Sequence, residues 1–151
     1  MLFRSPRRGA RVQLAILAKT ARVRIDAYTL LADEIKEYPG NFAARRLLAT
    51  MYGEEQRYLE QVEQLKYLAD ARPDDVATQL DYAQGLFNMG DYKACRRVMD
   101  GLVENNQEDA DVLLLEANLL AKEGKREEGR AVFERADALH TAAVKAAEGK
   151  K

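Results

Sequence analysis

Residues 76–109 read VATQLDYAQGLFNMGDYKACRRVMDGLVENNQED, and this 34-residue stretch shows the organisation on which the chain is built. Gly90 and Asp91 divide it into two segments dominated by residues of good helix propensity. Glycine ends a helix at low cost, so this pair marks a short turn. The stretch therefore predicts two helices joined by a tight connection.

The same organisation recurs when the sequence is shifted by 34 residues. Small residues coincide at Ala49, Ala83 and Ala117, where two helices need to approach closely. Prolines coincide at Pro39 and Pro73, where they block continuation of a helix between one pair and the next. Large apolar residues coincide at three further sets of positions: Tyr52, Leu86 and Leu120; Leu65, Met99 and Phe133; Leu68 and Leu102. The chain therefore contains an internal repeat.

These residues resemble the tetratricopeptide repeat (TPR), a 34-residue helix–turn–helix unit with the pattern Leu-Gly-x2-Tyr, then Ala-x3-Phe, then Pro. Three repeats in register are identified at residues 42–75, 76–109 and 110–143. The motif residues are, in chain order, Leu48-Ala49-x2-Tyr52, Tyr82-Ala83-x2-Leu86, Cys95-x3-Met99, Ala117-x2-Leu120 and Gly129-x3-Phe133.

The resemblance implies an all-α fold, a TPR-like α-solenoid of antiparallel helix hairpins wound into a right-handed superhelix. Hairpins are expected at residues 42–71, 76–104 and 110–140. The chain departs from the family pattern in having no Trp. It also departs where the second helix of each repeat normally carries a small Ala, which is replaced by Gln61, Cys95 and Gly129.

Residues 1–41 precede the repeats as a basic N-terminal arm and a helical segment. Apolar residues recur there at alternating spacings of four and three: Leu14, Ala18, Ala21, Ile25, Tyr28, Ala32 and Ile35. This spacing favours one long helix over about residues 9–37, which caps the first repeat or contacts a partner helix. A degenerate repeat over residues 8–41, folded as a hairpin, is the alternative. At the other end, the last helix is expected to overrun its repeat, so that residues 144–151 form its end and a tail.

Charge is distributed unevenly along the chain. Residues 1–25 contain seven basic residues and no acid, so the other 17 basic residues face all 25 acids. The basic segment has three interpretations: a solvated tail, an organelle-targeting segment, or a docking site for an acidic partner, RNA or an anionic membrane. A helix in this segment also offers a route to oligomers.

The residues that most chemistry requires are scarce. His140 is the only His and Cys95 the only Cys, so neither a catalytic triad nor a zinc site has its ligands. His140 is expected at the surface and Cys95 in a packing position. No glycine-rich phosphate loop follows a strand. We therefore expect no enzymatic activity, no cofactor or metal site and no small-molecule substrate. The lone Cys and the lack of a long apolar run favour a cytoplasmic location.

The resemblance implies that the first helix of each hairpin lines a concave, partner-binding groove. The candidate binding residues in this sequence are Arg46, Thr50, Leu80, Asp81, Gln84, Phe87, Asn88, Leu114 and Asn118. Ordinary helix surface is the alternative interpretation, although clustered exposed apolar side chains usually mark a contact site. Positions that hold a peptide carboxylate in some TPR co-chaperones carry Asp81 and Asp111 here, which would repel it.

The expected function is that of a protein-interaction scaffold or adaptor that binds a partner segment in the groove. A chaperone for an exported or assembling subunit is one alternative, since small secretion chaperones have a similar layout. Docking to nucleic acid or a membrane surface through the basic N-terminus is the other.

Overall fold

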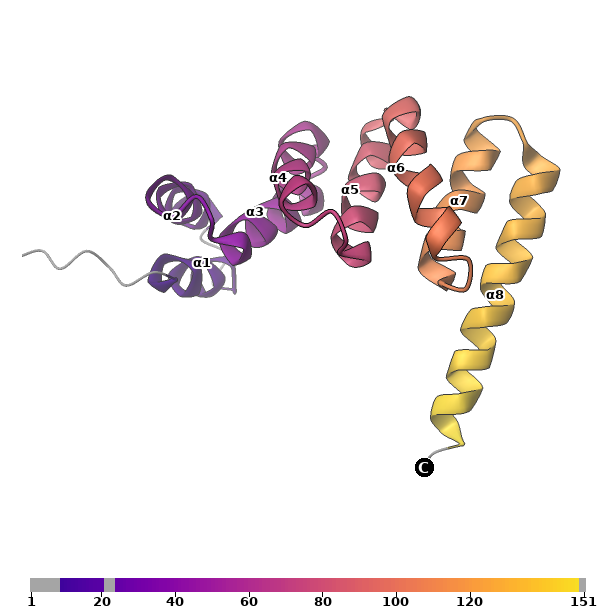
Figure 1. Cartoon of the computed structure of the whole chain (residues 1–151). Helices are drawn as coiled ribbons and strands as arrows, with labels where there is room; N and C mark the ends of the chain where they lie inside the picture. Colours follow the sequence, from indigo (N-terminus) through magenta and orange to yellow (C-terminus); the bar gives the residue numbers. More distant parts are fainter. Residues whose placement is uncertain (1–8, 21–23, 150–151) are drawn as a thin grey trace, which may run out of the picture. The chain divides into compact units, whose positions relative to one another are not determined.

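The computed structural model describes residues 9–20 and 24–149, and Figure 1 shows the eight helices that these residues form. The described residues contain no strand, which confirms the all-α fold class. The chain divides between Ala71 and Arg72 into two compact units.

The first unit contains two hairpins. Helices α1 (Ala10–Thr20) and α2 (Arg24–Glu37) form one, and α3 (Phe42–Glu54) and α4 (Tyr58–Ala71) form the other. The Asn41 side chain caps α3 by accepting a hydrogen bond from the Ala44 amide, which satisfies one of the free donors at a helix start. The α3–α4 pair confirms the hairpin expected at residues 42–71.

The expectation of one long helix over residues 9–37 is wrong, and the hairpin alternative is observed. The amide of Gly9 donates a hydrogen bond to Glu34 Oε1 at 2.7 Å, and Arg11 Nη1 lies 2.5 Å from Glu37 Oε2. In a continuous helix, residues 9 and 34 would be about 37 Å apart, at about 1.5 Å per residue. Ala21 and Arg22, where the sequence shows no turn signal, lie outside the described residues.

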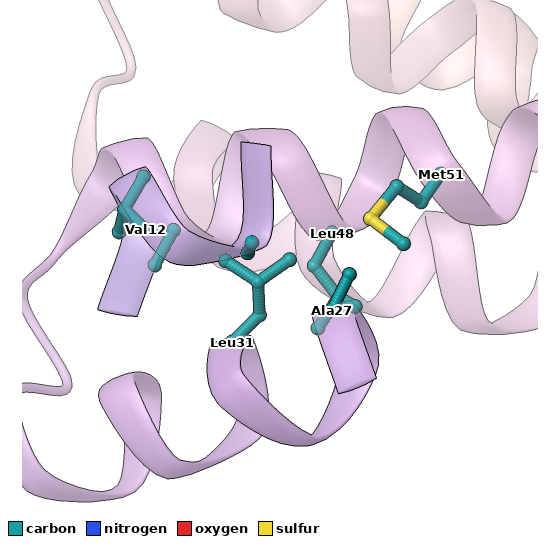
Figure 2. Packing of buried hydrophobic residues seen from close by; sticks show 7 residues of the cluster. Val12, Ala27, Leu31, Leu48 and Met51 are labelled. Atoms are coloured by element: carbon teal, nitrogen blue, oxygen red, sulfur yellow. The ribbon is translucent and has the colours of Figure 1, made fainter. Parts of the chain in front are cut away.

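A core shared by α1, α2 and α3 holds the N-terminal hairpin against the first repeat (Figure 2). Val12 from α1, Leu31 from α2 and Met51 from α3 are all at most 7% exposed. Ala15 and Ala27 are fully buried, so their small side chains allow the two helices to approach closely. The contacting face of α1 differs from the expected one: Leu14 is 51% exposed, whereas Tyr28 and Ile35 do pack against this core.

The second unit also contains two hairpins. Helices α5 (Val76–Met89) and α6 (Tyr92–Asn105) form one, and α7 (Ala110–Lys122) and α8 (Arg126–Glu148) form the other. These confirm the hairpins expected at residues 76–104 and 110–140. Gly90 and Gly124 have φ angles of 86° and 85°, a conformation that glycine adopts without strain. Helix α8 continues past the start of α7, as the sequence indicated (Figure 1).

Arg96 fastens α6 to α7 in this unit. Its guanidinium contacts Glu116 Oε1 at 2.8 Å and Glu123 Oε1 at 2.7 Å. Burial lowers the pKa of Arg96, but the hydrogen bonds to Glu123 and Glu116 outweigh it and raise the pKa above its ordinary value. The same hydrogen bond from Arg96 lowers the pKa of Glu123. One charge cluster therefore joins the α5–α6 hairpin to the α7–α8 hairpin.

Candidate functional site

A hollow of about 250 Å³ lies between α5 and α7, the first helices of the two hairpins of the second unit. Seven residues line it: Leu80, Asp81, Gln84, Asp111, Leu114, Leu115 and Asn118. Five of these are among the nine binding residues predicted from the sequence: Leu80, Asp81, Gln84, Leu114 and Asn118. The structure thus brings together the central part of the predicted set.

The apolar side chains of this hollow differ in how far they are exposed. Leu115 is only 2% exposed and belongs to the core, whereas Leu114 next to it is 42% exposed. Leu80 is half-buried on the facing helix. Leu114 is therefore the side chain that offers the most apolar surface to a ligand.

Polar groups surround these apolar side chains. The Gln84 amide nitrogen donates to Asn88 Oδ1 at 2.9 Å, one turn further along α5. Asn118 is exposed on α7. Side-chain amides both donate and accept hydrogen bonds, so Gln84 and Asn118 suit a peptide backbone or a polar side chain.

The charge of the hollow has one sign. Asp81 and Asp111 contribute carboxylates from α5 and α7, and no basic residue is among the seven that line it. A carboxylate-bearing ligand would be repelled there, whereas a basic or neutral one would not. This bias agrees with the exclusion of a peptide-carboxylate site from the sequence.

The other four predicted residues lie elsewhere. Phe87 is half-buried near the end of α5, with its ring against Tyr92 of α6 in an edge-on arrangement at 5.4 Å. Asn88 is exposed beside it and contacts the hollow through Gln84. Arg46 and Thr50 are exposed on α3, in the first unit, so the hollow of the second unit does not include them.

A second hollow of about 250 Å³ lies between α7 and α8. Asp111 and Leu114 line it as well, so Leu114 forms a ridge between the two hollows. Phe133 and His140 line its α8 side. The repeat overlay assigned Phe133 to packing between helices, but Phe133 is 50% exposed. A repeat's second helix is normally covered by the next repeat, and α8 is the last helix that the structure describes.

The described residues offer no site for metal or thiol chemistry. No group of three or more His, Cys, Asp and Glu side chains among them is arranged to hold a metal ion. Cys95 is buried, and burial raises the pKa of its thiol to about 11. The thiol is therefore protonated at neutral pH and is a poor nucleophile. In the described part of the chain, no helix is long and apolar enough to cross a membrane.

The comparisons with known proteins agree with this geometry. Residues 54–119 match the family model described as tetratricopeptide repeat. None of the curated protein sequences matches the chain significantly. A solved structure of MamA designated MSR-1 superposes with a TM-score of 0.74 at 20% identity, covering 88% of this chain and 76% of that one. A MamA structure designated AMB-1 also gives 0.74 at 20% identity, covering 87% and 72%. At this identity the likeness shows the fold alone.

Proposed function

We propose that this chain, whose tetratricopeptide repeats support a scaffold for protein interactions, binds a basic or neutral partner segment at the hollow between α5 and α7. Proteins of this kind are generally scaffolds rather than enzymes. The observation that carries the proposal is the position of Leu114, 42% exposed on the ridge between two hollows.

The chemistry of the hollow supports a segment with one apolar anchor. A few central apolar side chains usually carry most of the affinity of a protein interface. Leu114 and half-buried Leu80 provide such a centre, and Gln84 and Asn118 provide hydrogen bonds beside it. Asp81 and Asp111 favour Lys or Arg next to the anchor.

The remaining predicted residues extend this proposal. Asn88 lengthens the polar edge along α5, and Arg46 and Thr50 offer a further contact surface on α3. Phe87 supports the end of α5 through Tyr92. Because Phe87 is half-buried in that contact, we assign it less of the binding energy than Leu114. A cytoplasmic partner is part of this proposal.

Site-specific photocrosslinking in the native cell tests the proposal. A photoreactive amino acid at Asn118, on the edge of the hollow, is expected to capture a protein that mass spectrometry identifies. The matched control carries the same group at Lys66, which is exposed on α4 of the first unit. A partner captured equally well from both positions, or only from Lys66, would show that the hollow is not the binding site.

A further inference from the structure

The outward face of α1 carries an unusual apolar cluster. Leu14, Ile16 and Leu17 are 51%, 43% and 63% exposed, whereas Val12 and Ala15 on the inward face are buried. The other large exposed apolar side chains of the described residues are spread singly over α4, α7 and α8. Single exposed apolar residues are common, but a cluster of this kind marks a contact surface.

The sequence around this cluster is basic on both sides. No charged residue occurs from Val12 to Ala18. Basic residues flank that interval at Arg4, Arg7, Arg8 and Arg11 before it and at Lys19, Arg22 and Arg24 after it, and residues 1–25 contain no acid. The positions of these charges are known here from the sequence, since residues 1–8 and 21–23 lie outside the described part of the chain.

Arg11 has a structural partner of its own. It pairs with Glu37 across the hairpin at 2.5 Å, and Glu34 Oε2 lies 4.0 Å away. We therefore assign the attraction for an anionic surface to the other six basic residues of this segment.

From this arrangement we infer that α1 docks the chain on an anionic lipid surface, lying along it without spanning it. An anionic bilayer matches both features at once: its headgroups attract Lys and Arg, and the boundary of its acyl chains accepts Leu and Ile side chains. RNA would attract the charges but leave the aliphatic side chains without an apolar surface to contact. Helix α1 has 11 residues, which suits the plane of a membrane but is too short to cross one.

The core of the first unit is compatible with this docking. Helix α1 contacts α2 and α3 through Val12 and Ala15, which are on the opposite side from the exposed cluster. The docking face can therefore contact lipid without opening the hairpin.

Vesicle binding by the full chain tests the inference. Binding to vesicles of equimolar phosphatidylserine and phosphatidylcholine is expected to exceed binding to phosphatidylcholine alone. The double variant Leu14→Gln/Leu17→Gln should lower the partition coefficient by about tenfold or more, because it removes the apolar contact. Leu59→Gln is the matched control, since Leu59 is 62% exposed on α4. Arg7→Gln/Arg8→Gln should lower partitioning by about tenfold and reduce its salt dependence.

The chain contains no Trp, so Leu17→Trp introduces a single indole that reports insertion. Its emission should shift to the blue on anionic vesicles and be quenched by brominated lipids, whereas Leu59→Trp should do neither. If the Leu14→Gln/Leu17→Gln variant partitions like the wild type, headgroup attraction alone explains binding and the inference is wrong. It is also wrong if the vesicles bind no chain while RNA or an acidic protein does.

Discussion

A Cβ atom added at Gly129 of α8 would lie 2.9 Å from the backbone carbonyl oxygen of Ala117 on α7. The same atom would lie 3.4 Å from the Cβ of Leu120. The two helices therefore pack more closely here than an alanine allows. This explains why the chain departs from the family pattern, which has Ala at this position of the second helix.

Gly129→Ala is therefore expected to destabilise the second unit by about 1–3 kcal/mol, since overpacking outweighs the gain in helix propensity of about 1 kcal/mol. Gly101→Ala is the control: Gly101 lies in α6, and a Cβ there meets nothing within 4 Å. That variant should be neutral or more stable by about 0.5–1 kcal/mol. Thermal and urea unfolding of both variants measure the difference. Equal effects would mean that the α7–α8 contact is looser than described.

The Arg96 cluster predicts a second change in stability. Arg96→Met leaves Glu116 and Glu123 facing each other without their cation, which should cost about 2 kcal/mol at neutral pH. Arg97→Met, at the exposed neighbouring position, should change stability by no more than about 0.5 kcal/mol. Urea unfolding at neutral pH gives both values, and a similar loss in the two variants would argue against a specific link between α6 and α7.

The same cluster gives stability a defined pH dependence. The folded-state pKa of Glu123 is lowered by Arg96 from an ordinary value of 4.5. Its stabilising contribution is therefore complete above that value and is lost as the pH falls through the folded pKa. The difference in unfolding free energy between the wild type and Arg96→Met should be largest at neutral pH and should narrow below about pH 4.5. A difference that stays constant down to pH 3 would exclude this assignment.

Glu34 ties the N-terminal hairpin to the first repeat. Its side chain is 0% exposed, and Oε1 accepts hydrogen bonds from the Gly9 amide and from Asn41 Nδ2, both at 2.7 Å. Glu34→Leu removes both acceptors and should destabilise the first unit by about 2–3 kcal/mol, with faster hydrogen exchange in α1. Glu34→Gln keeps one oxygen acceptor and should cost less. If Glu34→Leu leaves exchange in α1 unchanged, the hairpin is held by its apolar core alone.

Phe87→Ala separates support of the fold from binding. The ring is half-buried against Tyr92, so its removal should cost about 1–3 kcal/mol of stability. The folded fraction should still bind its partner more tightly than Leu114→Ala does. Calorimetric titration together with thermal unfolding gives both quantities. A stable Phe87→Ala variant with the larger loss of affinity would move the binding centre to the end of α5.

The repeats could be predicted from the sequence because their signals are local. Gly90, Gly124 and Pro73 mark where helices end, and three copies in register reinforce one another. The N-terminal hairpin could not be predicted in the same way. An apolar spacing of four and three is compatible with one long helix or with two antiparallel helices, and no glycine or proline marks the turn.

The candidate site was predictable in part for a similar reason. Helix periodicity places Leu80, Gln84, Leu114 and Asn118 on groove-facing positions, and the structure brings them to one hollow. Exposure depends on which neighbour covers a side chain, and this is not encoded locally. Phe133 has the residue type of a packing position yet is 50% exposed. Leu14 is exposed because the hairpin buries Val12 and Ala15 instead.

The affinity of Leu114→Ala for the crosslinked partner tests the central proposal most directly. Leu59→Ala is the matched control, because Leu59 is also an exposed leucine, on α4. Leu114→Ala is expected to weaken binding by roughly 30-fold, equivalent to about 2 kcal/mol, with little change in thermal stability, while Leu59→Ala binds like the wild type. Unchanged affinity of Leu114→Ala, or equal losses in the two variants, would contradict the proposal that the chain binds its partner at the hollow between α5 and α7.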